Sequence, residues 1–455
     1  MTLSRRAFLL SGVASGALLL GRPTGVLSSL LGTAGAAEAA TRASRLFPGS
    51  GLSLVHADLH NHTLLSDGSG DAANAFSSMR SWGLDVAAIT DHATTGKLGA
   101  NCGACGEVSG IDEAEWQRIQ ALADAENHDG FVAMRGFEWS SPQLGHMNVW
   151  MSSTWTDPLT CGAVDAESVG AFFLHEGGSS VPASGPLNSV LRTSPTAGVS
   201  MTGFYDWLAA DPSRPVLGGG SDGIAGFNHP GREGGRFGFF KYDPRLANRV
   251  VSMELFNRGE DYLFEQVPTA PSPMVECLDK GWKVGFTGVT DEHGTNWGEP
   301  DGKGRTGLWI KGELNRASVR EAMTARRFFC TREKGLRMDA SLKGVQMGGR
   351  VTHTSGVVPI SVDLDKGSDW WGRNVRIQVL QTGRPLPTIV HEVDAVVPTD
   401  AQAPIAFDCP INRANGEWVV VRVTDPAVGG DGRANGTAFA SAGRAIAYAS
   451  PFFLT

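Results

Sequence analysis

Short apolar runs alternate with segments of helical periodicity between residues 52 and 327. The helical segments repeat apolar side chains every three or four positions, as Trp116, Ile119 and Ala123 do, whereas the short runs have the length of buried strands. Since parallel strands are connected through helices, this alternation predicts a parallel α/β architecture. The expected strands are 52–59, 85–90, 131–139, 147–151, 225–228, 250–256 and 284–290, and the expected helices are 72–82, 112–127, 271–280 and 317–327.

The alternation loosens between residues 152 and 215 into a stretch rich in glycine, serine and proline. Helices are expected within it at 167–175 and 203–210. Long connections of this kind run over the surface and often carry function. We interpret the stretch as an excursion over one face and a candidate substrate lid.

After about residue 335 the period of the pattern changes from helical to two. Segments such as 357–362, 374–379 and 418–423 alternate apolar and polar side chains and are separated by turn-rich sequence. This spacing is typical of an all-β sandwich. The length of 455 residues also favours two domains, which we place at 45–335 and 336–455.

Charge and the N-terminus bear on partners and location. The chain has 47 acidic and 39 basic residues, a net charge of −8, whereas a nucleic-acid surface is normally basic, so no nucleic-acid partner is expected. Arg5 and Arg6 precede an apolar stretch and small residues, which resembles a twin-arginine export signal over residues 1–36. We therefore expect a periplasmic or secreted protein without a stable membrane span, exported by the twin-arginine machinery.

The six cysteines divide into two groups. Cys102, Cys105 and Cys161 lie in Gly-rich sequence, where a local disulfide or free thiols are expected, with a Cys102-x-x-Cys105 zinc or redox pair as the alternative. The others have apolar neighbours and are expected in the core: Cys277, Cys330 and Cys409.

The first expected strand ends in a pair of metal-type ligands. His60 and His62 are two residues apart, and in an extended chain such residues point to the same face, so both can hold one cation while Asn61 points away. Asp67 lies within a Ser66-Asp67-Gly68 turn that can return its carboxylate toward the same or an adjacent ion.

The same kind of residue recurs beside most of the later strands. Parallel barrels place the carboxyl ends of their strands on one rim, so ligands far apart in the chain are expected to converge there. Imidazole and carboxylate without thiolate suit zinc, manganese or iron at a hydrolytic centre. The residues at these positions are His60, His62, Asp91, His92, Glu138, His146, His229, Asp291, Glu292 and His293. The histidines left as surface or structural are His56, His128, His175, His353 and His391.

The motifs at 60–68, 89–92, 136–138, 227–230 and 291–293, taken together and in this order, resemble the PHP (polymerase and histidinol phosphatase) superfamily of metal-dependent phosphoesterases. The resemblance covers roughly residues 52–330. The exported, sandwich-tailed layout looks most like the branch known as CehA/McbA-type metallohydrolases. What the resemblance implies is a distorted (β/α)7 TIM-like barrel that holds two or three divalent metal ions.

The resemblance also implies roles for individual residues. A hydroxide bridging the metals would attack phosphorus, with Asp291 as a candidate proton acceptor and His229 or His293 at the leaving group. The first ion would be held by His60, His62, Glu138 and Asp291, the second by Glu138, His146 and His229, and the third by Asp67, His92 and His293. Asp58 and Asp91 are expected to orient histidines, and Arg232, followed by Arg258 and Lys97, is expected to bind phosphate.

Three functions fit these features. The first is a phosphoesterase that cleaves a small phosphate mono- or diester. The second is a carbamate or aryl ester hydrolase on the same metal centre, which aromatic side chains such as Trp139, Trp150 and Trp155 would favour. The third is a non-catalytic surface-binding protein, against which the size of the ligand set argues.

Overall fold

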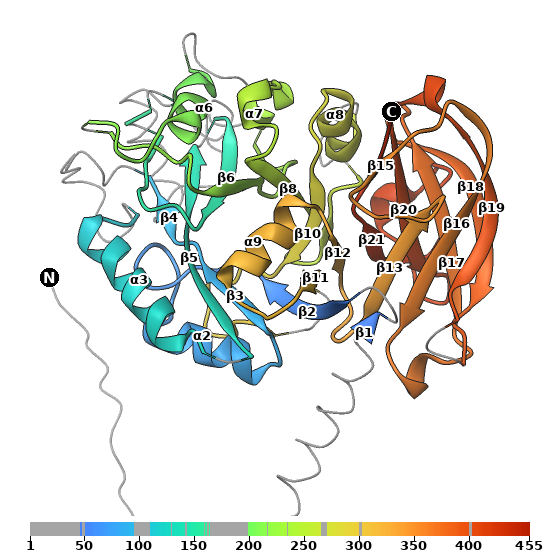
Figure 1. The fold of residues 1–455 in the computed structure, drawn as a ribbon, viewed down its shortest axis with the longest axis horizontal. Coiled ribbons are helices and arrows are strands. Elements are labelled where there is room, and N and C mark those ends of the chain that lie inside the picture. Colours follow the sequence, from blue (N-terminus) through green and yellow to red (C-terminus); the bar gives the residue numbers. More distant parts are fainter. Residues whose placement is uncertain are drawn as a thin grey trace, which may run out of the picture. The chain divides into compact units, whose positions relative to one another are not determined.

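The protein has a mixed α/β fold that is rich in strands (Figure 1). In this computed structural model the described residues of Arg45–Thr455 belong to one compact unit. The residues that the structure describes are 46–47, 51–94, 110–158 except 129 and 142, 160, 161, 163, 199–264 except 216 and 234, 271–299, 303–399 and 403–455.

Seven strands of the N-terminal part pair with one another in chain order. β2–β3, β3–β5, β7–β8 and β8–β10 are parallel pairs, and a single parallel bridge joins Asn61 to Glu292 beyond the ends of β2 and β10. All seven match strands expected from the sequence. Their bounds are β2 Leu52–Asp58, β3 Val86–Ile89, β5 Val132–Ser141, β6 Gly145–Trp150, β7 Ile224–Phe227, β8 Val250–Asn257 and β10 Gly285–Val289.

The expectation of a purely parallel sheet was wrong at β6, which is antiparallel to both β5 and β7. Only three residues separate β5 from β6. A parallel connection needs a crossover of a dozen residues or more. A link of this length therefore permits only a hairpin. β11 (Arg305–Lys311) was not expected at all, and it is antiparallel to β2 and to β12 (Phe328–Thr331).

Among the described residues, three helices begin at side-chain caps that the sequence supplies, namely Asp71, Asp112 and Asn315. Asp112 accepts a hydrogen bond from the backbone of Glu115, whose side chain accepts one in return, so a capping box starts α3. α3 then buries Trp116, Ile119 and Ala123, the residues that gave the helical period. The helices are α2 Ala72–Ser81, α3 Glu113–Glu126, α6 Thr202–Ala209, α7 Arg236–Phe240, α8 Pro273–Asp279 and α9 Arg316–Thr324. The expected helix at 167–175 lies outside the described residues.

The C-terminal residues form mainly antiparallel strands, drawn in orange and red in Figure 1; Arg350–Val351 and Phe452–Leu454 are a parallel pair. One four-stranded sheet has the order β14-β13-β16-β19. Alternate side chains of β16, such as Val358 and Ile360, share a buried cluster with Ile377 and Val379 of β17, as expected of strands with one face toward a core. The strands are β13 Arg337–Leu342, β14 Val345–Gln346, β15 Arg350–Val351, β16 Ser355–Asp365, β17 Asn374–Gln381, β18 Thr388–Val396, β19 Ile405–Asn412, β20 Trp418–Asp425, β21 Arg444–Ala449 and β22 Phe452–Leu454.

Shorter elements connect these strands and helices. They are β1 Leu46–Phe47, β4 His92–Ala93, β9 Glu260–Asp261 and the 3-10 turns η2 Pro244–Leu246, η3 Ser368–Trp370, η4 Arg413–Asn415 and η5 Gly432–Ala434.

Strand pairing crosses the expected domain boundary near residue 335. β12 pairs with β21, and Ser450 Oγ donates to the backbone oxygen of Phe328 at 2.6 Å. The hydroxyl of Tyr448 donates to Asp261, 2.9 Å from Oδ2. These buried contacts join residues on both sides of position 335, which belong to one compact unit. The division at 335 therefore stays a prediction from the change of sequence pattern.

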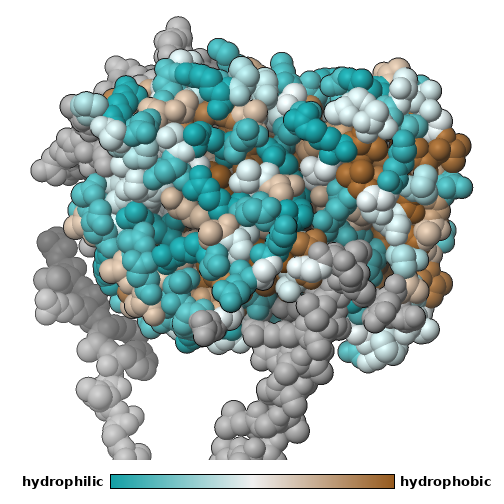
Figure 2. Space-filling view, viewed as in Figure 1, coloured by the Kyte–Doolittle hydropathy of each residue, from teal (hydrophilic) through white to brown (hydrophobic). Residues whose placement is uncertain are grey.

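The surface and the cysteines can also be compared with what the sequence predicts. In Figure 2 hydrophilic residues cover much of this face, and hydrophobic ones gather over the C-terminal strands, where Val357 and Val396 are exposed. Within the described residues, no helix is both long and apolar enough to cross a bilayer. Cys277, Cys330 and Cys409 are buried, as expected, and Cys161 is a free thiol; Cys102 and Cys105 lie outside the described residues.

The stability of the C-terminal strands is expected to fall as the pH rises. Burial raises the pKa of Asp339 in β13 from 3.8 to about 7, so the folded state keeps a proton that the unfolded state loses. The contribution of this proton to the free energy of unfolding is complete below about pH 4 and is lost as the pH rises through about pH 7. It is at most about 4 kcal/mol, because each pKa unit corresponds to about 1.4 kcal/mol. Thermal denaturation of the wild type and Asp339→Asn at pH 5 and pH 8 measures it. Asparagine cannot ionise, so an equal loss of stability in both proteins would contradict the assignment.

Candidate metal centre

The His60-Asn61-His62 segment places two imidazoles on one face, as expected. Their Nε2 atoms are 3.0 Å apart, and both rings are fully buried. The Asn61 side chain points the other way, where it donates to the backbone oxygen of Ala88 at 3.2 Å and accepts from Thr290. Asn61 thereby fixes the alternation that brings the two histidines together.

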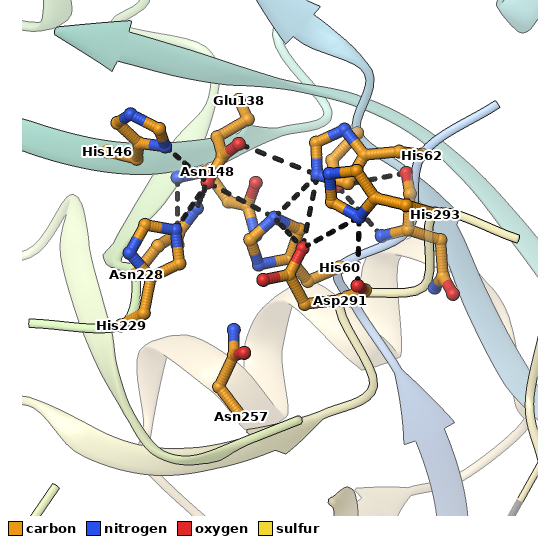
Figure 3. A network of polar contacts seen from close by, with 12 residues as sticks. His60, His62, Glu138, His146, Asn148, Asn228, His229, Asn257, Asp291 and His293 are labelled. Carbon is orange, nitrogen blue, oxygen red and sulfur yellow. Dashed lines mark hydrogen bonds and ion pairs between the residues drawn. The ribbon is translucent and has the colours of Figure 1, made fainter. Parts of the chain in front are cut away.

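Glu138, near the end of β5, lies at the centre of the histidines (Figure 3). Its Oε1 atom is 3.1 Å from His60 Nε2, 3.2 Å from His229 Nε2 and 3.4 Å from His146 Nδ1. Its Oε2 atom is 2.8 Å from His92 Nδ1. One carboxylate therefore contacts imidazoles from four separate segments.

His146 lies here because β6 is antiparallel. The start of such a strand meets the end of its neighbour β5, as the pairing of Ser140 with His146 shows. The unexpected strand direction therefore explains why a histidine that opens a strand joins histidines that follow strands.

Asp291 and Asp67 complete the group on the other side of His62. Asp291 Oδ1 is 3.4 Å from His62 Nε2 and 3.5 Å from His60 Nε2. Asp67 Oδ2 is 3.2 Å from His293 Nε2 and 3.5 Å from His92 Nε2. The structure thus brings together all nine residues expected as metal ligands, and their role as ligands remains a prediction.

The backbone is strained at two of these positions. His229 has φ 24° and Asp291 has φ 49°. Residues other than glycine rarely adopt positive φ values. Such conformations cost on the order of 1–3 kcal/mol and tend to occur at functional sites. Here each directs its side chain toward Glu138 or the His60–His62 pair.

The spacing and chemistry of these atoms fit divalent cations. Nitrogen and oxygen atoms about 2.0–2.2 Å from one ion lie roughly 3–3.5 Å from each other, and the contacts above span this range. His62 Nδ1 and His229 Nδ1 are buried without a hydrogen bond, although carboxylates lie 3.6 Å away. The groups able to hold an ion are His62, Asp67, His92 and His293; His60, His62 and Glu138; His92, Glu138 and His146; and His146, His229 and Glu233.

Burial and charge act in opposite directions on the pKa values of this cluster. Burial disfavours the imidazolium form of His60, yet the adjacent carboxylates of Asp291, Glu138 and Glu254 raise its pKa well above the usual value. Burial also disfavours ionised Glu138, yet the surrounding histidines hold its pKa well below the usual value. The carboxylates therefore require positive charge beside them, either as protons on imidazoles or as cations.

The cluster opens into a cavity of about 420 Å³ whose wall includes Arg232 and Arg258. Arg232 Nη1 donates to Asp291 Oδ2 at 3.0 Å and Nη2 to Asn257 at 2.9 Å. Arg258 Nε donates to the backbone oxygen of Asp291 at 2.9 Å. Both arginines expected to bind phosphate thus line the site, while Lys97 lies outside the described residues.

The tryptophans named for a hydrophobic substrate do not line this cavity. Trp150 and Trp155 are buried, and their indole nitrogens donate to the backbone oxygen of Leu59 and to Glu113. Trp139 is buried and stacks on Phe204 with ring centres 4.4 Å apart. Packing accounts for all three.

Comparison with known proteins gives likenesses of fold only. No protein-family model and no curated protein matches the chain. A two-domain protein from Bacteroides vulgatus, containing a predicted PHP-like metal-dependent phosphoesterase, is 13% identical over 89% of this chain and 96% of its own, with a TM-score of 0.39. An inferred metal-dependent phosphoesterase from Bifidobacterium adolescentis is 17% identical over 59% of this chain and 95% of its own, with a TM-score of 0.31.

An amidohydrolase from Chromobacterium violaceum with bound sulfate and no metal is 15% identical over 53% of this chain and 90% of its own, with a TM-score of 0.28. These identities and TM-scores are too low to assign the chain to a family, so its function is inferred below from its own residues.

Two carboxylates at the site were not expected from the sequence. Glu254 Oε1 is 2.8 Å from His60 Nδ1, and its Oε2 accepts from the backbone of His229 at 2.8 Å. Glu233 Oε2 is 3.6 Å from His229 Nδ1. The available signals were a lone carboxylate within the apolar run of β8 and a carboxylate four residues after a histidine.

The aspartates expected to orient histidine rings have other partners. Asp58 accepts from the backbone and hydroxyl of Thr290. Asp91 accepts from the backbone and hydroxyl of Thr63 and from Ser66. These contacts hold the backbone around the site, whereas Glu254 contacts the ring of His60.

Glu254→Gln is expected to weaken metal binding and activity by roughly 10–100-fold, the usual effect of removing a partner that orients a ligand. The amide has one acceptor oxygen where Glu254 uses two, so it cannot hold His60 and the His229 backbone in the same way. Competition with a chelator measures the affinity. Glu276→Gln is the matched control, because this buried carboxylate pairs with Arg236. Equal affinities in the two variants would show that Glu254 has no such role.

Proposed function

We propose that the protein is an exported, metal-dependent phosphoesterase of the PHP superfamily, of the CehA/McbA type. The observation that carries this proposal is the position of Glu138, which contacts His60, His92, His146 and His229 within 3.4 Å. A carboxylate shared between separate histidine groups is suited to bridging two divalent ions. Its place beside an arginine-lined cavity favours an anionic substrate.

Two or three zinc, manganese or iron ions held by these residues would supply an activated water and Lewis-acid stabilisation of developing negative charge. Arg232 would bind a phosphoryl oxygen while its contact with Asp291 keeps the guanidinium in place. Ionised Asp291 would accept a proton from the attacking water, and His229 would serve as a metal ligand.

The proposal extends to the architecture and location. The seven strands β2, β3, β5, β6, β7, β8 and β10 would correspond to the distorted (β/α)7 TIM-like barrel, with residues 336–455 as the smaller sandwich. The twin-arginine signal over residues 1–36, which lies outside the described residues, would direct the folded protein to the periplasm or medium.

The first test is metal analysis of the purified protein, with hydrolysis of aryl phosphate mono- and diesters and an aryl carbamate before and after chelation. We expect at least two divalent ions per chain and phosphate ester hydrolysis that chelation abolishes and metal restores. Activity confined to the carbamate would replace the phosphoesterase with the carbon-ester hydrolase. A protein that stays inactive and binds no metal after reconstitution would leave only the surface-binding role.

A further inference from the structure

A second cavity, of about 440 Å³, shares no lining residue with the first. Its wall is formed by β5, α3, α9 and the segments after β6 and before β7. In Figure 1, β5 lies between α3 and α9, and it contacts both helices. A volume of this size suits a small organic ligand.

Arg135 of β5 lines this cavity, and one of its side-chain nitrogens has no hydrogen-bond partner. The residue is 9% exposed, and its guanidinium stacks 3.6 Å from the Trp116 ring centre. Two of its nitrogens donate at 3.3 Å to the backbone oxygens of Trp116 and Ser152, and Nε has no hydrogen-bond partner. Burial lowers the pKa of Arg135 to about 10, so an anion beside it would stabilise its charge.

Two arginines of α9 line the same wall, and one of them, Arg316, has an unused donor. Arg316 Nε donates to the backbone oxygen of Ala133 and Nη1 pairs with Asp124 at 2.6 Å, while Nη2 is buried with no acceptor. Arg320 donates to the backbone oxygens of Asp222 and Gly223. Three guanidinium groups thus line the cavity with one carboxylate, that of Asp222. Asp124, outside the lining, pairs with Arg316, so one positive charge is left in excess.

Two further polar atoms indicate what else a ligand carries. The Ser152 hydroxyl, of a residue 2% exposed, has no partner and can donate to an oxyanion. Asp222 Oδ2 accepts from the backbone of Ser153 at 2.9 Å, whereas Oδ1 is buried without a donor. A buried carboxylate oxygen without a donor is costly, so a hydroxyl beside Oδ1 would be stabilising.

We propose that this cavity binds a small organic oxyanion, a phosphate or carboxylate, that also carries a hydroxyl group. The oxyanion contacts Arg135, Arg316 and Arg320, and the hydroxyl donates to Asp222 Oδ1. The two methionines in the wall, Met134 and Met151, contact the carbon chain. This site is separate from the metal centre and does not depend on the proposed function.

Calorimetric titration of the full protein with three probes tests the proposal. The probes are 2-hydroxyethylphosphonate, whose carbon–phosphorus bond resists phosphoesterases, 3-hydroxypropionate, and ethylphosphonate, which lacks the hydroxyl. We expect saturable binding of at least one hydroxylated probe, and the tighter of the two identifies the oxyanion. If it is the phosphonate, ethylphosphonate should bind several-fold more weakly.

Variants assign the binding to this cavity. Arg316→Gln should weaken it about tenfold, since a charge-assisted hydrogen bond is lost, and Arg320→Gln serves if that variant does not fold. Arg327→Gln is the matched control, because this arginine pairs with Glu321 and lies outside the cavity. Arg232→Gln, in the first cavity, should leave the binding unchanged. Absence of saturable binding, or binding that Arg232→Gln weakens and Arg316→Gln and Arg320→Gln do not, would overturn the proposal.

Discussion

Glu138→Ala is expected to abolish bound metal and to reduce hydrolysis by roughly 10³-fold or more, equivalent to about 4 kcal/mol of transition-state stabilisation. The expectation follows from position, because Glu138 alone among the carboxylates of the described residues contacts all four of these histidines: His60, His92, His146 and His229. Removing it leaves four buried imidazoles without the negative charge that they share. Elemental analysis and initial rates on an aryl phosphate, with metal added in excess, measure both effects.

Glu138→Gln separates charge from shape at the same position. The amide keeps the volume but loses the negative charge, so we expect most of the same loss of metal. Glu276→Gln again serves as the control for removing a buried carboxylate, and circular dichroism establishes that each variant is folded. A folded Glu138→Ala protein with full metal content and wild-type rates would show that the cluster is not the catalytic centre.

Arg232→Gln is expected to lower kcat/KM for phosphate esters by roughly 10²-fold while leaving metal content intact. Loss of one positioned donor to a developing oxyanion has an effect of this size. Lysine at the same position should restore part of the rate, since it keeps the charge but not the planar fork. Rates on an aryl phosphate and an aryl carbamate, measured in parallel, give the comparison.

The carbamate arm tests whether Arg232 recognises phosphate or only supports Asp291, to which it donates at 3.0 Å. A recognition role predicts a loss that is much larger for the phosphate ester. Equal losses on both substrates would mean that the arginine acts through Asp291. Arg245→Gln is the control, because this half-exposed arginine pairs with Asp243 and Asp206 away from the cavity.

The convergence of the candidate ligands could be predicted because it depends on local rules. His60 and His62 share a face through the two-residue period of an extended chain, and Glu138 lies on β5, a strand recognised by its apolar run. Sequence alone could place these residues at strand ends, and strand ends meet at one edge. The structure adds the distances that make a shared carboxylate identifiable.

The parts that could not be predicted depend on contacts between distant segments. Glu254 lies 194 residues from His60, and nothing in the pattern of β8 indicates which ring it contacts. The short link between β5 and β6 indicates an antiparallel pair, whereas the alternation of strands and helices along the chain favours parallel strands. The arginines of the second cavity come from β5 and α9, which no local pattern relates.

The pairing of β12 with β21 limits where the protein can be truncated. A shortened chain that stops near residue 335 would leave the β12 edge bare, together with the groups that Ser450 and Tyr448 now satisfy. Bare strand edges promote aggregation, so such a fragment is expected to collect in inclusion bodies. The half with the candidate metal centre and the β-rich C-terminal part are therefore not expected to fold when they are separated.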